Sequence, residues 1–233
     1  MSKSIPWIAL FFLLLLIAPN AMARDFFGGF SPLPMWLNVD YGELNDYVEG
    51  IGVAPLDDGA FLMGWSVYLY VHPSVRVGLM GTGGSKSADG RDDIITRQAK
   101  VGLGFIGATG EYVFSFTKGD VAIGTMLGYG HADIELRQSM AGPINWDQIW
   151  EGYRSEPALP STFMNIMEGN FFAYKPFIRL KYEITSWLSL QGSAGYLGAE
   201  VSSWKHRGDL EIKNEPSLDF GGLILTLGPH IGF

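Results

Sequence analysis

The chain has 233 residues, no cysteine, and 16 Lys and Arg against 24 Asp and Glu, for a formal net charge of −8 at pH 7. This acidic balance argues against nucleic-acid binding, which needs clustered cations. Without cysteine there is no disulfide framework and no thiol for a lipid anchor. With 31 glycines, 14% aromatic and only 17% charged residues, the composition favours a membrane barrel over an ordinary secreted domain.

The first 23 residues predict a secretory signal peptide. Lys3 gives a positive start, residues 8 to 17 form an unbroken apolar run, and Ala21-Met22-Ala23 is a small-x-small cleavage site. The alternative is an uncleaved membrane anchor, but a spanning helix needs roughly 20 apolar residues. We therefore expect signal-peptide-dependent export and a mature chain that begins at Arg24.

Residues 24 to 58 predict an N-terminal segment of one strand and one short helix. Apolar side chains alternate from residue 33 to residue 41, and a helix-like stretch follows from residue 43 to residue 49. This segment either supplies a closing strand or plugs the barrel that we expect to span residues 59 to 233.

Three hairpins with period-two alternation follow along the chain. Their arms and turns are 61 to 71 and 75 to 80 around 72 to 74, 96 to 116 and 121 to 136 around 117 to 120, and 174 to 184 and 188 to 196 around 186 to 187. The first arm of the second hairpin changes its apolar face near Gly107 to Gly110, which predicts a bulge or a bend. Aromatic residues near predicted strand ends suggest interfacial girdles: Tyr68, Tyr70, Tyr129, Trp187 and Tyr196.

The last strand carries the most specific pattern in the chain. From residue 223 to residue 233, Leu or Ile alternates and the chain ends in Phe233, with only Pro229 breaking the pattern. This resembles the C-terminal strand of outer-membrane β-barrel proteins, which in that family is read by the barrel assembly machinery. The resemblance implies that machinery as a partner and an assembly signal made of Leu225, Leu227, Ile231 and Phe233.

The connection lengths predict the topology. The short turns alternate with long links at about 83 to 94, 139 to 166 and 204 to 217, as short periplasmic turns alternate with long external loops in this class. Counting back from the C-terminus gives seven strands, and closure requires an eighth from residues 33 to 41. We predict an all-β, closed, antiparallel, up-and-down transmembrane β-barrel of about eight strands, a monomer in contact with outer-membrane lipid. Its architecture resembles the small OmpA/OmpX-type barrels.

The lumen of an eight-stranded barrel is just wide enough to be filled by side chains. We therefore expect inward-facing charges to pair across it, since unpaired charges are costly in so narrow a space. This favours a salt-bridged plug over a continuous water channel. The predicted lumen-facing network is Arg76, Lys100, Lys175, Arg179, Lys181, Glu183 and Asp219.

Most cofactor motifs give negative results. Residues 81 to 87 look like a phosphate loop, but the Lys is displaced and no helix follows, so nucleotide binding is not expected. Asp89, Asp92 and Asp93 lack the Glu that completes a calcium pattern, and the four histidines are too dispersed to form a metal site. We expect no cofactor and no metal.

Two accessible clusters remain as candidate sites. His131 and Asp133 share one strand face with Ser139 nearby, the residue types of a hydrolase at the barrel rim, although a polar strand end that emerges into water is the favoured explanation. In the loop from 139 to 166, Trp146, Trp150 and Tyr153 form either an external binding surface or a cap on the barrel mouth.

The leading hypothesis is a non-enzymatic integral outer-membrane protein that contributes to envelope structure or binds partners through its loops. The alternatives are a narrow passive pore, a rim hydrolase acting on lipid or peptide, and a soluble exported lipid-binding barrel with its apolar faces turned inward.

Overall fold

The computed structural model describes residues 28–92, 95–140, 162–201, 203–206, 210–213 and 218–232. The predicted signal peptide, the loop residues Trp146, Trp150 and Tyr153, and the terminal Phe233 all lie outside these residues. Among the residues described, no helix is both long and apolar enough to cross a membrane.

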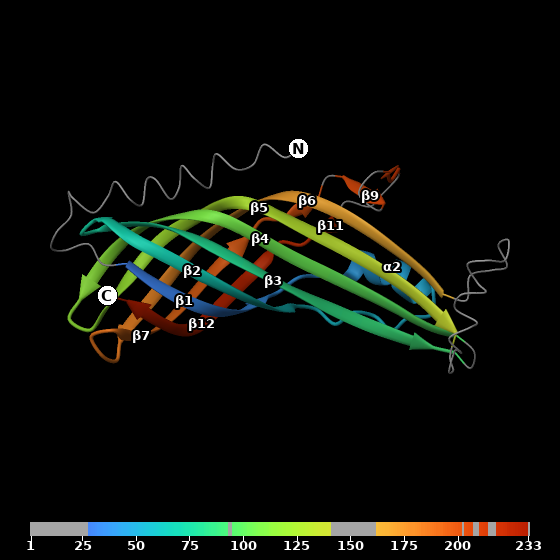
Figure 1. The fold of residues 1–233 in the computed structure, drawn as a ribbon, viewed down its shortest axis with the longest axis horizontal. Coiled ribbons are helices and arrows are strands. Elements are labelled where there is room, and N and C mark those ends of the chain that lie inside the picture. The colour runs from blue at the N-terminus through green and yellow to red at the C-terminus, as the bar shows by residue number, and fades with distance from the viewer. Residues whose placement is uncertain are drawn as a thin grey trace, which may run out of the picture.

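Eight strands form a closed antiparallel ring (Figure 1). They are β1 (Gly28–Leu37), β2 (Ala60–His72), β3 (Val75–Arg91), β4 (Ile95–Phe116), β5 (Gly119–Met140), β6 (Thr162–Glu183), β7 (Leu188–Leu197) and β12 (Gly222–Gly232). Each strand pairs with the next, and β12 pairs with both β7 and β1, which closes the ring. The prediction of an eight-stranded up-and-down barrel is confirmed.

The N-terminal strand closes the barrel and does not plug it. β1 begins at Gly28, five residues before the predicted start, and pairs along its whole length with β2. Its other edge meets the last strand, with Phe30 opposite Ile231 and Trp36 opposite Leu225. The predicted end at residue 41 was wrong, because the alternation continues into the link that leads to α2 (Gly42–Gly50).

Large apolar side chains cover the outside of the ring. As predicted from the sequence, every second residue of a strand points outward. The outward positions hold large apolar side chains on strands all around the barrel. This is the opposite of a soluble lipid-binding barrel, so that alternative is contradicted. Closure pairs the backbone groups between strands, as hydrocarbon requires. The exposed set includes Trp65, Val67, Ile106, Tyr112, Phe114, Ile123, Leu127, Phe172, Ile178, Leu180, Leu190, Leu225 and Leu227.

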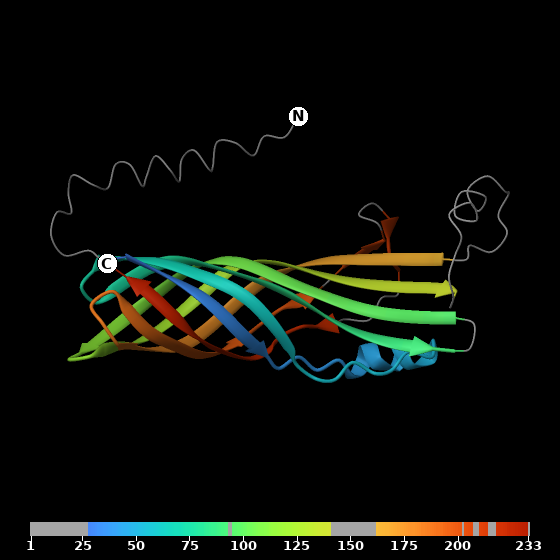
Figure 2. The same cartoon turned by 60° about the horizontal axis from the view of Figure 1, so that its bottom comes forward.

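The strands differ greatly in length, so the sheet continues beyond the ring. β4, β5 and β6 have 22 residues each, against 10 in β1 and β7 and 11 in β12. The extension lies at the end opposite the short turns (Figure 2), called the outer end below. The predicted long link at 83 to 94 was wrong, because β3 pairs with β4 as far as Arg91 opposite Thr96.

Short elements lie at the outer end beside the extended sheet. They are α2 and the strands β8 (Glu200–Val201), β9 (Trp204–His206), β10 (Leu210–Glu211) and β11 (Leu218–Asp219). β9 pairs with the outer-end part of β6, where Gly169 lies opposite Trp204. β11 pairs with β8. Leu44 and Val48 of α2 join Ile134 of β5, Trp204 and Leu218 in one buried apolar cluster.

Candidate functional site at the outer end

The short-turn half of the lumen holds a chain of alternating charges. The Arg76 guanidinium lies 2.7 Å from a carboxylate oxygen of Glu111 and 3.2 Å from one of Asp120. Arg179 approaches the other oxygen of Glu111 at 3.1 Å, and Lys181 Nζ lies 2.9 Å from Asp120. Each carboxylate thus bridges two cations, and the chain runs along the lumen side of the four neighbouring strands β3, β4, β5 and β6.

A second polar chain lies against this ion-pair chain. The hydroxyls of Ser31 and Tyr68 hydrogen-bond to the two ring nitrogens of His230, each at 2.9 Å. The Arg76 guanidinium carbon lies 4.4 Å from the centroid of the Tyr68 ring. Tyr68 therefore points into the lumen, as does Tyr70, which donates a hydrogen bond to Asp120. Neither is an interfacial girdle residue, so that interpretation was wrong for both, whereas Tyr129 is exposed on the outer face.

The structure places only part of the predicted charge network in the lumen. Arg76, Lys175 and Arg179 are buried there, and Lys181 reaches it through Asp120. The placement of the other three was wrong. Lys100 lies on the outward face of β4 beside an external groove, Glu183 is exposed at the short-turn end, and Asp219 is exposed in β11, where its carboxylate accepts a hydrogen bond from the Gly221 amide.

The acidic partners Glu111 and Asp120 were missing from the predicted lumen network. Asp120 was placed in the turn at 117 to 120, although it belongs to β5, and β4 was expected to change face near Gly107. The register of β4 with β3 and β5 runs without a shift. Val101 and Phe105 face inward at the outer end, and Phe114 faces outward on the same unbroken strand. The apolar side changes because the surroundings change from an apolar interior to lipid. Since residues at even spacing share one face of an unbroken strand, Glu111 faces inward like Val101.

The outer end contains an apolar pocket of about 370 Å³. One wall is the inner face of β5 and β6, and the others come from α2, β9, β11 and the segment after β10. Lys213 is the one charged residue among those that line it. Trp204 is 2% exposed, and its indole Nε1 has no hydrogen-bond partner among the described residues. The lining residues are Leu44, Tyr47, Val48, Ile51, Ile134, Leu136, Met167, Trp204, Ile212, Lys213 and Leu218.

Nearby, the link between β1 and α2 is also packed against the interior. Tyr41 is 3% exposed, and burial raises the pKa of Tyr41 to about 12. Its phenol therefore stays protonated in neutral solution. The side chain of Asn45 both donates to and accepts from the backbone of Leu56, at 2.9 and 2.8 Å, which fastens α2 to the segment after it. The wall that α2 gives to the pocket is held in place by these bonds.

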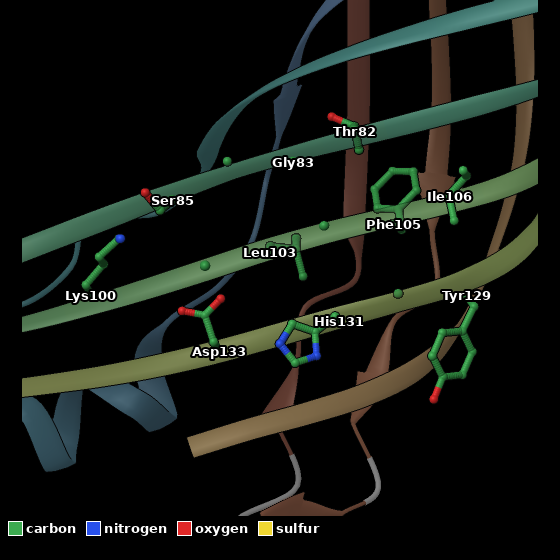
Figure 3. A pocket seen from close by; sticks show the side chains of 14 residues that line it. Thr82, Gly83, Ser85, Lys100, Leu103, Phe105, Ile106, Tyr129, His131 and Asp133 are labelled. Atoms are coloured by element: carbon green, nitrogen blue, oxygen red, sulfur yellow. The ribbon is translucent and has the colours of Figure 1, made fainter. Parts of the chain in front are cut away.

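A shallower groove of about 670 Å³ lies on the outside of β3, β4 and β5 (Figure 3). His131 and Asp133 line it, but the predicted triad does not assemble. His131 Nδ1 is 3.1 Å from the side-chain oxygen of Asn170 on β6. Ser139 follows His131 by eight residues on one continuous strand, which separates them by roughly 26 Å at 3.3 Å per residue. The rim-hydrolase candidate His131, Asp133 and Ser139 was therefore wrong as a triad.

Neither the motifs nor the described side chains indicate a metal ion. Within the described residues, no group of three or more His, Cys, Asp or Glu is placed to hold a metal. In the last strand, Leu225, Leu227 and Ile231 are exposed on the outer face of β12. This is the face that the assembly-signal hypothesis requires them to present.

The closed ring, its apolar exterior and its short turns at one end define an integral outer-membrane β-barrel protein. No family model matches the chain, and no curated protein matches it by sequence.

Solved structures with a similar fold are outer-membrane proteins. Neisserial surface protein A is 11% identical with a TM-score of 0.47, the match covering 89% of this chain and 97% of that one. The outer membrane protein OprG from Pseudomonas aeruginosa is 8% identical with a TM-score of 0.47, over 90% of this chain and 96% of that one. Ail, the attachment invasion locus protein of Yersinia pestis, is 12% identical with a TM-score of 0.40, over 91% and 100%.

Proposed function

We propose that this protein is a non-enzymatic outer-membrane barrel that binds an amphiphile with a single acyl chain in the pocket at its outer end. The observation that carries the proposal is the composition of the pocket, which is apolar on every wall and has one cation at Lys213. The connections between strands at the outer end supply much of this lining. The proposal therefore names a ligand class for the loop-mediated binding that the sequence suggested.

The volume and lining of the pocket suit a small apolar ligand. Ligand pockets typically span about 300 to 1,000 Å³ and combine apolar walls with a few polar groups that fix orientation, and this pocket has about 370 Å³. Leu136 and Met167 project from β5 and β6 into the interior, and the buried Trp204 carries an unused N–H donor. An acyl chain fills such a space without leaving its own polar groups unpaired.

The single cation selects the head group. Lys213 is exposed, so its ammonium stays in water while its stem lines the pocket. A carboxylate at the end of the acyl chain can pair with this ammonium and remain hydrated. We therefore propose a medium-chain fatty acid as the ligand class.

Binding of octanoate tests this proposal. The full mature protein, with ¹³C-labelled methionine methyls and held in an amphipol, is titrated with octanoate, and the Met167 methyl resonance is expected to shift to saturation. Leu136→Trp fills the pocket and should abolish the shift. Leu127→Trp is the matched control, because it makes the same change on the outer face of the same strand, and it should leave the shift intact.

Comparing octanoate with octanol tests whether Lys213 binds the carboxylate head group. Exposed ion pairs contribute about 0.2 to 1 kcal/mol, so Lys213→Gln should weaken octanoate binding by roughly threefold and leave octanol binding unchanged. A Met167 resonance that does not move, or one that moves equally in Leu136→Trp, would contradict the proposal.

Passive conduction is opposed by the filling of the lumen. Arg76, Lys175 and Arg179 have at most 1% of their surface exposed, and the ion-pair chain ties together the lumen faces of four neighbouring strands, β3 to β6. We expect planar-bilayer recordings of the purified protein to show no conductance steps in 1 M potassium chloride. Discrete steps that persist after removal of contaminating porins would favour the passive-pore alternative.

The remaining partner assignments are proposals of the same kind. The outward apolar set of β12, together with Phe233, supports recognition of Leu225, Leu227 and Ile231 by the barrel assembly machinery. A monomer surrounded by lipid agrees with an apolar exterior that runs around the ring. The segments proposed are a signal peptide at 1–23, the closing strand and helix at 24–58, and the rest of the barrel at 59–233.

A further inference from the structure

The described part of the lumen holds more cations than carboxylates. Four basic side chains project into it, namely Arg76, Lys175, Arg179 and Lys181. Only two acidic side chains accompany them, Glu111 and Asp120, both at most 4% exposed. The cluster thus carries two positive charges that the carboxylates described there do not balance.

The ion pairs identify where the excess lies. Glu111 is shared by Arg76 and Arg179, and Asp120 is shared by Arg76 and Lys181. Lys175 is 0% exposed and takes no part in this chain. Among the described residues, the hydrogen-bond partner of its ammonium is a thioether, Met80 Sδ at 3.8 Å, and a thioether is a weak acceptor.

Further donors without partners lie on the neighbouring residues. Arg179 Nε and Nη2, and both polar atoms of the Gln191 side chain, are buried without a hydrogen bond among the described residues. Both cations approach the ring of Phe177, whose centroid is 5.3 Å from Lys175 Nζ and 5.0 Å from the Arg179 guanidinium carbon. The two positive charges are therefore at most about 10 Å apart.

Such an arrangement is costly as it stands. Buried polar groups are normally hydrogen-bonded, and buried charges are normally paired. Two buried cations, with idle N–H donors on Arg179 and no third carboxylate in the described cluster, are satisfied by an anion. Gln191 lies opposite Lys181 in the register of β6 and β7, six residues along β6 from Lys175 and so roughly 20 Å from it at 3.3 Å per residue. Its amide is therefore too far away to share a small ion with Lys175.

We infer that the lumen contains a binding site for a small inorganic anion such as chloride, formed by Lys175 and Arg179. The anion neutralises the charge left over by the ion-pair chain and accepts the idle donors. It is a structural ligand that completes the plug of the barrel, and it is separate from the acyl-chain pocket at the outer end.

Chloride dependence of stability tests the inference. The folded, full mature protein in lipid vesicles is unfolded by urea in sodium chloride and in sodium gluconate of equal ionic strength, since gluconate is too large for a packed lumen. A ligand present at about ten times its Kd raises the ratio of folded to unfolded protein roughly tenfold. We expect that ratio to rise about tenfold in 0.2 M chloride.

Lys175→Met is the decisive variant, because it removes the charge and keeps an unbranched side chain of similar length. Its heat-shifted gel migration shows whether it folds, and its readout is the chloride dependence, not its absolute stability. We expect the dependence to vanish in Lys175→Met and to persist in Lys213→Met, which lies outside the lumen. Crystals grown in bromide should show an anomalous peak beside Lys175 in the wild type.

Three outcomes would overturn the inference. The first is a wild type with equal stability in chloride and gluconate, the result expected if water alone fills the site or if Lys175 is uncharged. The second is a dependence that persists in Lys175→Met. The third is a bromide peak only at the protein surface, which marks an adventitious ion only. None of these results bears on octanoate binding, so the two proposals fail separately.

Discussion

Glu111→Gln is expected to lower the free energy of unfolding by about 3 to 5 kcal/mol, because removing one partner leaves the others as uncompensated buried charges. Glu111 has no exposed side-chain surface, and its oxygens lie 2.7 Å from Arg76 and 3.1 Å from Arg179. The amide keeps the shape of the carboxylate but presents an N–H group to one of the two guanidiniums. Two cations then lose their shared counter-charge at once.

Urea titration of the protein in lipid vesicles, followed by tryptophan fluorescence and heat-shifted gel migration, measures this loss. Glu183→Gln is the matched control, because it makes the same change at an exposed position at the short-turn end of β6. Surface substitutions of this kind usually change stability by less than about 0.5 kcal/mol. Equal effects at Glu111 and Glu183 would show that the ion-pair chain does not hold the lumen together.

The sequence predicted the strands correctly wherever one face of a strand contacts lipid and the other faces the polar lumen. In β6, Ile178 and Leu180 face lipid while Arg179 and Lys181 face the lumen, so alternation alone assigns each side. The short turns were also correct, because each falls between two such strands. The same reasoning placed the last strand, where Leu225 and Leu227 are exposed to lipid and Thr226 is buried.

The alternation of apolar residues gave wrong assignments where the barrel interior changes from polar to apolar along a strand. At the outer end the interior becomes apolar, so Val101 and Phe105 point inward and Lys100 points outward on the unbroken strand β4. The pattern was therefore taken for a bulge, and Lys100 was assigned to the lumen. The outer half of β3 carries Gly83, Gly84, Ser85 and other small residues, whose faces have no hydrophobic contrast and whose strand conformation comes from pairing with β4.

The candidate sites could not be predicted from the sequence, because they are formed by contacts between residues far apart in the chain. The pocket joins Leu44 of α2, Leu136 of β5, Trp204 of β9 and Leu218 of β11, which are separated by long stretches of chain. The polar chain on His230 joins the first and last strands of the ring through Ser31. Glu111 was within reach of sequence reasoning, since it alternates with the apolar Tyr112 and Phe114, which face lipid.

Ile178→Arg is the second change for which we expect a large effect, and it tests the lipid assignment of the outer face. Ile178 is 57% exposed near the middle of the outward apolar stretch of β6 between Phe172 and Tyr182. Ile123 and Ala194 lie opposite it on the neighbouring strands. A charge at the midplane of the lipid face of a barrel costs about 2 to 4 kcal/mol, because the guanidinium must leave water or draw water into the hydrocarbon. Urea unfolding in vesicles should show a loss of this size.

Asn170→Arg supplies the comparison within the same strand face. Asn170 is exposed eight residues from Ile178, beyond Phe172 and on the outer-end side, and near the interface the cost falls to about 0 to 1 kcal/mol. A barrel surrounded by water would tolerate both changes alike, since an arginine on an exposed strand face meets solvent at either position. The difference between the two variants therefore measures how far the hydrocarbon reaches along β6. A difference near zero would place the exposed apolar residues against something other than a bilayer.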